Sequence, residues 1–141
     1  MFVGSLPRAP RATRRAAVDL LVLGDPAWTW HASWTMARLS ILEREALDAF
    51  AEAVRRLLPD RLERIVLFGS RARGEGRDDS DLDVLVLVRR LRREERGMVL
   101  DAGFDVGLAL GLVLSPLVMD VARWGGDAKL AREIDREGVA L

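Results

Sequence analysis

The chain has 141 residues and carries equal numbers of basic and acidic side chains, 22 of each. This length fits a single domain, and the hydrophobic half of the composition is enough to bury a real core. The absence of cysteine excludes disulfides and thiolate metal sites, and one histidine excludes a multi-histidine site. The balanced charge gives no general attraction to nucleic acid, and no apolar run approaches the roughly 18 residues of a membrane span. We therefore expect a cytoplasmic domain that binds neither membranes nor, directly, nucleic acid.

The first 35 residues differ in character from the rest of the chain. Four arginines precede the first acidic residue, Asp19, and three of the four tryptophans gather near the end of this stretch. Its short apolar run, 20–23, lacks the length and the cleavage site of a targeting segment. We expect residues 1–35 to be an extension of uncertain order, either a tail, an extra packing element or an over-extended start. Residues 36–141 are expected to form the functional domain.

The first strong pattern along the chain predicts a helix over about 40–58. Ser40 and Glu43, three residues apart, form a capping box, and Pro59 ends the helix. Apolar side chains at helical spacing indicate its buried face. The residues concerned are Leu42, Ala46, Ala49, Phe50, Ala53, Val54 and Leu57.

Two apolar runs, 62–68 and 82–88, predict neighbouring buried strands. A second helix is expected to continue to about residue 110, with Leu91, Met98, Ala102, Val106 and Ala109 on its buried face. Three glycines weaken this prediction, because each costs about 1 kcal/mol relative to alanine in a helix. They are Gly97, Gly103 and Gly107.

The last third of the chain predicts one more strand and one more helix. The run 112–119 favours a strand, and Pro116 within it indicates an edge position because proline lacks an amide hydrogen. Asp127 is placed to cap a final helix, which Gly138 ends. The full order of elements predicts a two-layer α+β domain with its helices on one side of the sheet.

The loop between the first two strands carries the chemical signal. Gly69 and Ser70 follow the first strand, and after a spacer of ten residues Asp81 and Asp83 begin the second. Glycine lets the backbone approach phosphate oxygens, and the serine hydroxyl adds a donor. Alternate residues of a strand share a face, so the two carboxylates converge into an oxygen site of the kind that Mg²⁺ prefers. The pattern predicts a metal-dependent phosphoryl-transfer centre.

The same loop also has a purely structural interpretation as a polar hairpin turn. That interpretation leaves Asp83 unexplained, because Asp83 interrupts an apolar strand at the same parity as Asp81. Arg71 and Arg73 are candidate nucleotide contacts through the phosphates, although arginines in a charged loop are about as often solvated.

The Gly69-Ser70 pair, the spacer and the Asp81-x-Asp83 pair resemble the signature of the DNA polymerase β-type nucleotidyltransferase superfamily. The fuller strings 67–74 and 80–84 are similar to its minimal branch, the MNT domains. The resemblance implies a polymerase β-like fold, a small mixed β-sheet backed by helices. It implies that both aspartates are catalytic Mg²⁺ ligands and that Gly69 and Ser70 contact the triphosphate.

Members of this superfamily transfer a nucleoside monophosphate, often AMP from ATP, to a hydroxyl group, and many minimal members are antitoxins of a HEPN toxin. The resemblance thus implies an Mg²⁺-dependent nucleotidyltransferase with ATP as substrate and a HEPN-type protein as partner. The chain has no tyrosine, so a tyrosine acceptor would have to come from another molecule. Two alternatives stay open: a degenerate module that binds and neutralises a partner, and transfer to a small molecule.

The chain departs from the family pattern at one position. The superfamily usually has a third carboxylate on a later strand, facing the aspartate pair, and the run 112–119 contains no acid. Ser115 or Pro116 falls near the expected place. Either Asp105 or Asp120 substitutes, a substrate or partner supplies the group, or catalysis is weak or lost.

Overall fold

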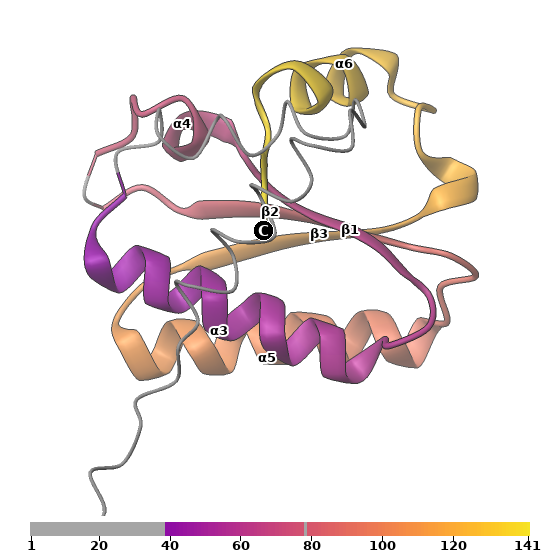
Figure 1. Cartoon of the computed structure of the whole chain (residues 1–141), viewed down its shortest axis with the longest axis horizontal. Helices are drawn as coiled ribbons and strands as arrows, with labels where there is room; N and C mark the ends of the chain where they lie inside the picture. Colours follow the sequence, from indigo (N-terminus) through magenta and orange to yellow (C-terminus); the bar gives the residue numbers. More distant parts are fainter. Residues whose placement is uncertain (1–38, 78) are drawn as a thin grey trace, which may run out of the picture.

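The computed structural model describes residues 39–77 and 79–141. The expected extension over 1–35 and the domain start at Met36 lie outside these residues. In the described part, no helix has the length and apolar character needed to cross a membrane. The elements follow the order α3 (Ile41–Leu57), β1 (Leu62–Phe68), α4 (Gly69–Ala72), β2 (Leu82–Val88), α5 (Arg93–Leu110), β3 (Leu114–Asp120), the 3-10 helix η3 (Val121–Arg123), α6 (Ala128–Glu137) and β4 (Val139–Ala140) (Figure 1).

The strands form one mixed sheet in the order β3-β2-β1-β4, which confirms the predicted α+β class. β1 and β2 pair in antiparallel fashion with Phe68 opposite Asp83, and β2 and β3 pair in parallel with Asp83 opposite Ser115. β3 is an edge strand, as Pro116 indicated. The short β4, which the sequence did not predict, pairs with β1 at the other edge. Asp83 therefore lies between the end of β1 and Ser115 of β3.

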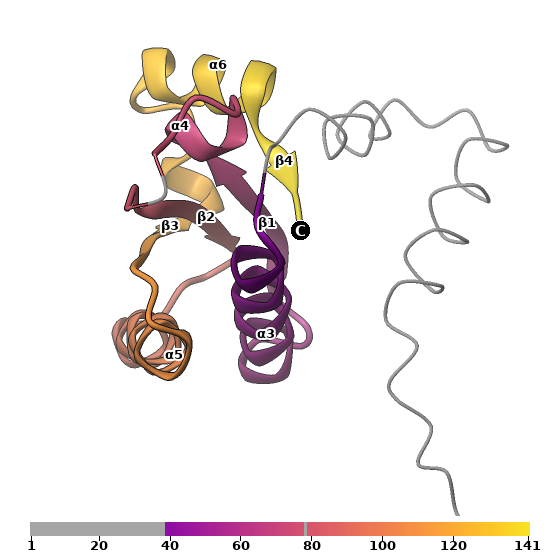
Figure 2. The ribbon, with the colours of Figure 1, turned by 90° about the vertical axis from the view of Figure 1, so that its left-hand side faces the viewer.

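Helices cover both faces of the sheet, so the predicted arrangement with helices on one side was wrong. α3 and α5 lie on one face, and α4 and α6 lie on the other (Figure 2). The physical reason is the central strand β2, in which every side chain from Val84 to Val88 is buried. A strand that is apolar at every position needs cover on both faces, whereas a strand with one solvated face alternates.

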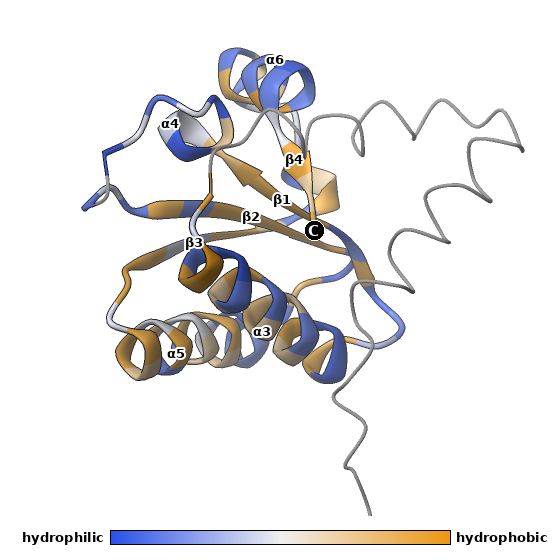
Figure 3. Ribbon diagram, turned by 60° about the vertical axis from the view of Figure 1, so that its left-hand side comes forward, coloured by the Kyte–Doolittle hydropathy of each residue, from blue (hydrophilic) through white to orange (hydrophobic). Residues whose placement is uncertain are grey.

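The larger core lies between the sheet and the pair α3 and α5. Leu47, Phe50 and Val54 of α3 are fully buried there against the strands. A smaller cluster of Val66, Leu85 and Ile134 joins the other face to α6. Figure 3 shows the hydrophobic strands between helices that carry many hydrophilic residues. Two cores of unequal size thus hold the sheet.

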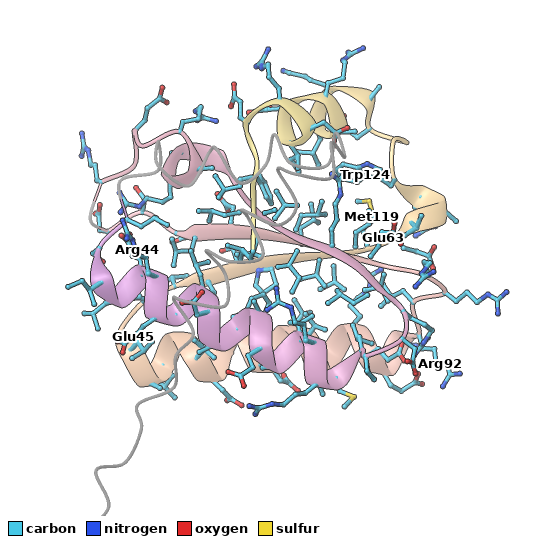
Figure 4. The ribbon with its side chains drawn as sticks, in the orientation of Figure 1. Arg44, Glu45, Glu63, Arg92, Met119 and Trp124 are labelled. Carbon is cyan, nitrogen blue, oxygen red and sulfur yellow. The ribbon has the colours of Figure 1, made fainter. Side chains whose placement is uncertain are left out.

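The smaller cluster continues toward the end of β3. Met119 and Trp124 lie on the same side of the sheet as α6 (Figure 4) and pack against that cluster. The Arg64 guanidinium lies 5.1 Å from the centroid of the Trp124 ring and donates to Asp135 of α6 at 2.8 Å. A cation over an indole face is an attractive arrangement, so this contact adds to the attachment of α6.

α3 begins with the predicted capping box, but its buried stripe is rotated from the predicted one. The Glu43 amide donates to the Ser40 hydroxyl at 3.2 Å, and the Ser40 amide donates to the Glu43 carboxylate at 2.6 Å. Leu42 is 50% exposed and Ala49 is exposed, while Leu47 is fully buried. The buried stripe begins at Glu43 rather than Leu42, because the Glu43 side chain is buried in an ion pair with Arg71 of α4.

Two of the α5 glycines lie where the helix comes close to β3. A Cβ atom on Gly103 would lie 2.7 Å from the Pro116 Cγ, and one on Gly107 would lie 2.6 Å from the Leu112 carbonyl oxygen. Both glycines are buried, whereas Met98 and Ala109, which we expected on the buried face, are exposed. The glycines that weaken the helix pattern are therefore needed where they stand, because a side chain at Gly103 or Gly107 would prevent the close approach of α5 and β3.

We expect Gly103→Ala to destabilise the protein by about 1–3 kcal/mol, because the added methyl group overpacks the contact with Pro116. Gly97→Ala in the same helix is the matched control, since outside the backbone of its own helix no atom lies within 4 Å of its added Cβ. That control should stabilise the protein by about 0.5–1 kcal/mol through the better helix propensity of alanine. Urea unfolding of both variants measures the two effects, and equal shifts would contradict the packing role of Gly103.

Candidate active site

Asp81 and Asp83 lie where β2 begins, at the end of the sheet that also carries α4. Asp83 has the parity of Leu85, which packs toward α6, so both aspartates belong to the sheet face that carries α4 and α6. Asp81 is exposed and Asp83 is half-buried. The two carboxylates predicted to converge are therefore placed on one face, at the open beginning of the strand.

Gly69 makes room for the Asp83 carboxylate. A Cβ atom at Gly69 would lie 2.6 Å from the Asp83 Oδ2, and the Gly69 backbone has a φ of +76°. Both features require glycine, because any other side chain would meet the carboxylate and would be strained at this φ. The end of β1, the start of α4 and the start of β2 thus meet around Asp83.

Ser70, in α4, accepts hydrogen bonds from the loop that returns the chain from α4 to β2. Its carbonyl oxygen accepts the amides of Glu75, at 3.0 Å, and of Gly76, at 3.2 Å. Its side chain is half-buried, and a Cβ on Gly76 would lie 3.2 Å from the Ser70 Oγ. The loop folds tightly back on Ser70, next to the predicted metal ligands. The predicted contacts of Gly69 and Ser70 with a triphosphate stay predictions.

Arg71 lies beneath this loop and is 5% exposed. Its Nη2 lies 2.5 Å from the Glu43 Oε2, and its Nη1 donates to the Gly76 carbonyl oxygen at 2.8 Å. These contacts tie the loop to the first turn of α3. The structure therefore gives Arg71 a positioning role, which the sequence had not indicated; its predicted contact with nucleotide stays a prediction.

The Glu43 carboxylate serves the capping box and the ion pair at once. Burial by itself raises the pKa of Glu43, but the hydrogen bond from the Ser40 amide and the hydrogen bond and charge of Arg71 outweigh burial. Together they hold the pKa below its ordinary value of 4.5. Glu43 is therefore ionised at neutral pH and neutralises the buried guanidinium.

Arg73 is exposed and binds acidic side chains of its own loop and of α6. Its guanidinium lies 3.0 Å from Glu75, 3.4 Å from Glu133 and 3.2 Å from Glu137. These ion pairs connect the end of α4 with the last helix. The predicted phosphate contact of Arg73 stays a prediction, and a phosphate would have to compete with these three carboxylates.

Ser115 occupies the position that faces the aspartate pair. It pairs with Asp83 across β2 and β3, and its hydroxyl donates to the Asp81 Oδ2 at 3.3 Å. Across residues 39–77 and 79–141, no three histidine, cysteine or acidic side chains form a group that could hold a metal ion. The site consists of two carboxylates and a neutral hydroxyl.

Neither of the two acids considered as substitutes reaches this position. Asp105 is exposed on α5, which covers the opposite face of the sheet (Figure 2). Asp120 ends β3, roughly 16 Å from Ser115 at about 3.3 Å per strand residue. Its carboxylate accepts the amides of Leu91 and Ala122, each at 2.8 Å. The position of α5 therefore excludes Asp105, and the register of β3 excludes Asp120.

The charge balance of the site suits a divalent cation. Burial raises the pKa of Asp83 above its ordinary value of 3.8, and the nearby charge of Asp81 raises this pKa further. A cation between the two carboxylates would remove their repulsion. Carboxylate oxygens at an open edge fit Mg²⁺, which binds through one or two carboxylates and completes its shell with water and phosphate.

Comparisons with known proteins agree on the kind of domain. The profile of the nucleotidyltransferase domain family matches residues 47–118. A relative from Methanocaldococcus jannaschii, "Putative protein adenylyltransferase MJ0141", is 32% identical over 75 residues, which cover 52% of this chain and 76% of the relative. A second relative from that organism, "Putative protein adenylyltransferase MJ1305", is 36% identical over 77 residues. The chain spans about half of this second relative, 52% of its length.

Two solved structures have a similar fold. One, a "putative minimal nucleotidyltransferase", superposes with a TM-score of 0.54 at 27% identity over 74% of this chain and 99% of that chain. The other, a toxin-antitoxin structure with AMP-PNP, superposes with a TM-score of 0.50 at 22% identity over 66% of this chain and 69% of that chain. The mixed sheet with helices is thus the architecture of minimal nucleotidyltransferases.

We expect Glu43→Gln to destabilise the protein by about 3–5 kcal/mol at neutral pH, because it leaves the buried Arg71 charge without its counter-charge. Glu45→Gln, on the exposed side of the same helix (Figure 4), is the control and should change stability by no more than about 0.5 kcal/mol. Urea unfolding measures both variants.

The same pair of variants predicts a pH dependence. The folded pKa of Glu43 is lowered, so the stability that its charge contributes is present above pH 4.5 and is lost as the pH falls below this value. The difference between wild type and Glu43→Gln should therefore narrow in acid. A difference that stays constant from pH 7 to pH 3 would contradict the role given to this carboxylate.

Proposed function

The chain belongs to the nucleotidyltransferase domain family, and we propose that it transfers AMP from ATP to a hydroxyl group of a partner protein in an Mg²⁺-dependent reaction. The observation that carries this proposal is the placement of Asp81 and Asp83 on one face at the start of β2, against the Gly69 turn. The names of the two archaeal relatives support a protein as acceptor. The resemblance to MNT domains supports a HEPN-type partner.

In this proposal each residue of the site has a chemical role. Asp81 and Asp83 hold the cation, which neutralises charge on the triphosphate when bound. Gly69 opens the backbone to phosphate oxygens, and the Ser70 hydroxyl donates to one of them. The acceptor oxygen forms a bond to the α-phosphorus, the bond from that phosphorus to the bridging oxygen breaks, and pyrophosphate leaves. The acceptor proton passes to a base.

A second candidate function is a non-catalytic module that binds and neutralises its partner. Ser115 favours it, because a neutral hydroxyl faces the aspartates and cannot accept a proton as a carboxylate does. Transfer to a small molecule is the third candidate. A pocket lined by Gly103, Gly107 and Leu114 lies along α5, which covers the face opposite the aspartates, so a small acceptor held there would not reach the aspartate pair.

Asp83→Asn tests the metal site. We expect nucleotidyl transfer to fall by more than about 100-fold. Loss of a residue that only hydrogen-bonds a metal ligand costs roughly 10–100-fold, and Asp83 is proposed to be a ligand itself. Asp105→Asn, which changes an exposed acid on the opposite face of the sheet, is the matched control and should keep full transfer activity. Full activity of Asp83→Asn would contradict the proposed metal site.

The same variant should keep its fold and become more stable in metal-free buffer. The folded pKa of Asp83 is raised, so its charge destabilises the folded state. This penalty begins near pH 3.8 and is complete above the raised pKa, which means that neutral asparagine should raise the thermal midpoint at pH 7. A lower midpoint than that of wild type would show that the Asp83 carboxylate has a stabilising role instead.

The acceptor is tested with the full chain, Mg²⁺, ATP labelled on the α-phosphate and the protein encoded beside this chain. We expect label on a hydroxyl side chain of that protein, and none when Asp81→Asn replaces the wild type. If the partner is bound and silenced without label, and Asp81→Asn silences it equally, the non-catalytic module is the function. Label that appears only on added small hydroxyl compounds would favour the third candidate.

A further inference from the structure

The backbone around Ser115 is fixed from both sides. The Leu82 amide donates to the Val113 carbonyl oxygen at 2.9 Å, just before the strand, and the Leu114 side chain is buried in the larger core. Directly after Ser115, Pro116 packs against the glycine face of α5 at Gly103. The backbone between two such anchors has little freedom, so the point from which the Ser115 side chain extends is set by the core.

Asp81, by contrast, is anchored on one side only, by the next residue, Leu82, which is buried and donates to Val113. Asp81 itself precedes the first residue of β2 and is exposed, and on its other side the Ser80 amide donates to the Arg77 carbonyl oxygen at 2.9 Å. The Ser115 hydroxyl donates to its Oδ2 at 3.3 Å. The hydrogen bond from Ser115 therefore restricts the orientation of the exposed Asp81 carboxylate at the end of the sheet.

We propose that Ser115 is a positioning residue that orients Asp81 and, by being neutral, makes cation binding at the aspartate pair depend on bound nucleotide. This inference rests on the proposed function. Among the residues that the structure describes, the site offers two carboxylates and no third acid, so a hard cation finds only part of its preferred oxygen shell on these residues. The phosphate oxygens of a nucleotide supply the missing negative ligands. By linkage, cation and nucleotide then strengthen each other's binding by the same factor.

The number of carboxylates at this position therefore sets the order of binding. A third carboxylate would let the protein hold the cation before the nucleotide arrives, because each added charge strengthens cation binding. With serine the protein has little affinity for the cation alone, and it binds the cation together with the triphosphate. Any acidic side chain placed at 115 should remove this dependence, because it lies in register with Asp83.

The test uses Mn²⁺ as a paramagnetic probe in the full-length protein, titrated without nucleotide and followed by electron paramagnetic resonance. We expect weak binding to wild type and at least about a 10-fold gain in affinity for Ser115→Asp. Leu108→Asp adds the same charge on the exposed side of α5 and is the matched control, with wild-type affinity expected. Tight binding of Mn²⁺ to wild type, or no gain for Ser115→Asp, would overturn the inference.

A second variant separates orientation from charge. Ser115→Ala removes the hydrogen bond to Asp81 without adding charge, so Mn²⁺ binding without nucleotide should stay weak. Its affinity for a fluorescent, non-hydrolysable ATP analogue with Mg²⁺ should weaken by about 10–100-fold. This is the usual cost of losing a hydrogen bond that orients a metal ligand. Unchanged analogue binding by Ser115→Ala, alongside tight binding by wild type, would overturn the positioning role.

Binding of the analogue by the wild-type protein and by Asp83→Asn separates a failure of the proposed site from a failure of the role given to Ser115. If wild type binds the analogue with Mg²⁺ and Asp83→Asn does not, the proposed site stands, and the Ser115 variants alone decide the inference. If wild type does not bind the analogue with Mg²⁺ at all, the proposed function fails, and the inference, which rests on it, fails too.

Discussion

The ion pair between Glu43 and Arg71 connects the parts of the molecule on which the site depends. The Glu43 carboxylate accepts hydrogen bonds from the Ser40 amide at the start of α3 and from the Arg71 guanidinium of α4, which begins the loop between β1 and β2. Arg71 in turn holds the Gly76 carbonyl oxygen, at the far side of that loop. Removing two charges from water is costly, and the cost is offset only when each partner is fully paired. The arrangement therefore fixes the loop in one conformation beside the aspartates.

The central strand β2 explains why the site lies at an end of the sheet and not in its middle. Along most of its length both faces are covered by helices, which leaves no space for a charged group. Only at its beginning, where Gly69 has no side chain, can the Asp83 carboxylate reach the surface. The same crowding that buries the strand raises the pKa of Asp83, and the nearby charge of Asp81 raises it further.

Local signals in the sequence predicted the parts of the fold that are determined locally. The Ser40 capping box, the Asp127 cap and the edge position of Pro116 each depend on a few adjacent residues, and the structure confirms them. The rotated stripe of α3 was missed because Glu43 is buried by an arginine 28 residues away. The exclusion of Asp105 likewise needed the face on which α5 lies, and that of Asp120 needed the register of β3, neither of which periodicity can supply. The placement of the aspartates on one face followed from alternation along a single strand, whereas their neighbour Ser115 came from a different strand.

Pro116 also affects how the rim of the site meets other chains. β3 is an edge strand, and an edge with regularly spaced amide donors and carbonyl acceptors invites another strand to pair with it. Proline next to Ser115 removes one of these donors and interrupts the series at the point where the site begins. Addition of a foreign strand is disfavoured there. The residue that packs β3 against α5 thus also disfavours edge-to-edge aggregation through this strand.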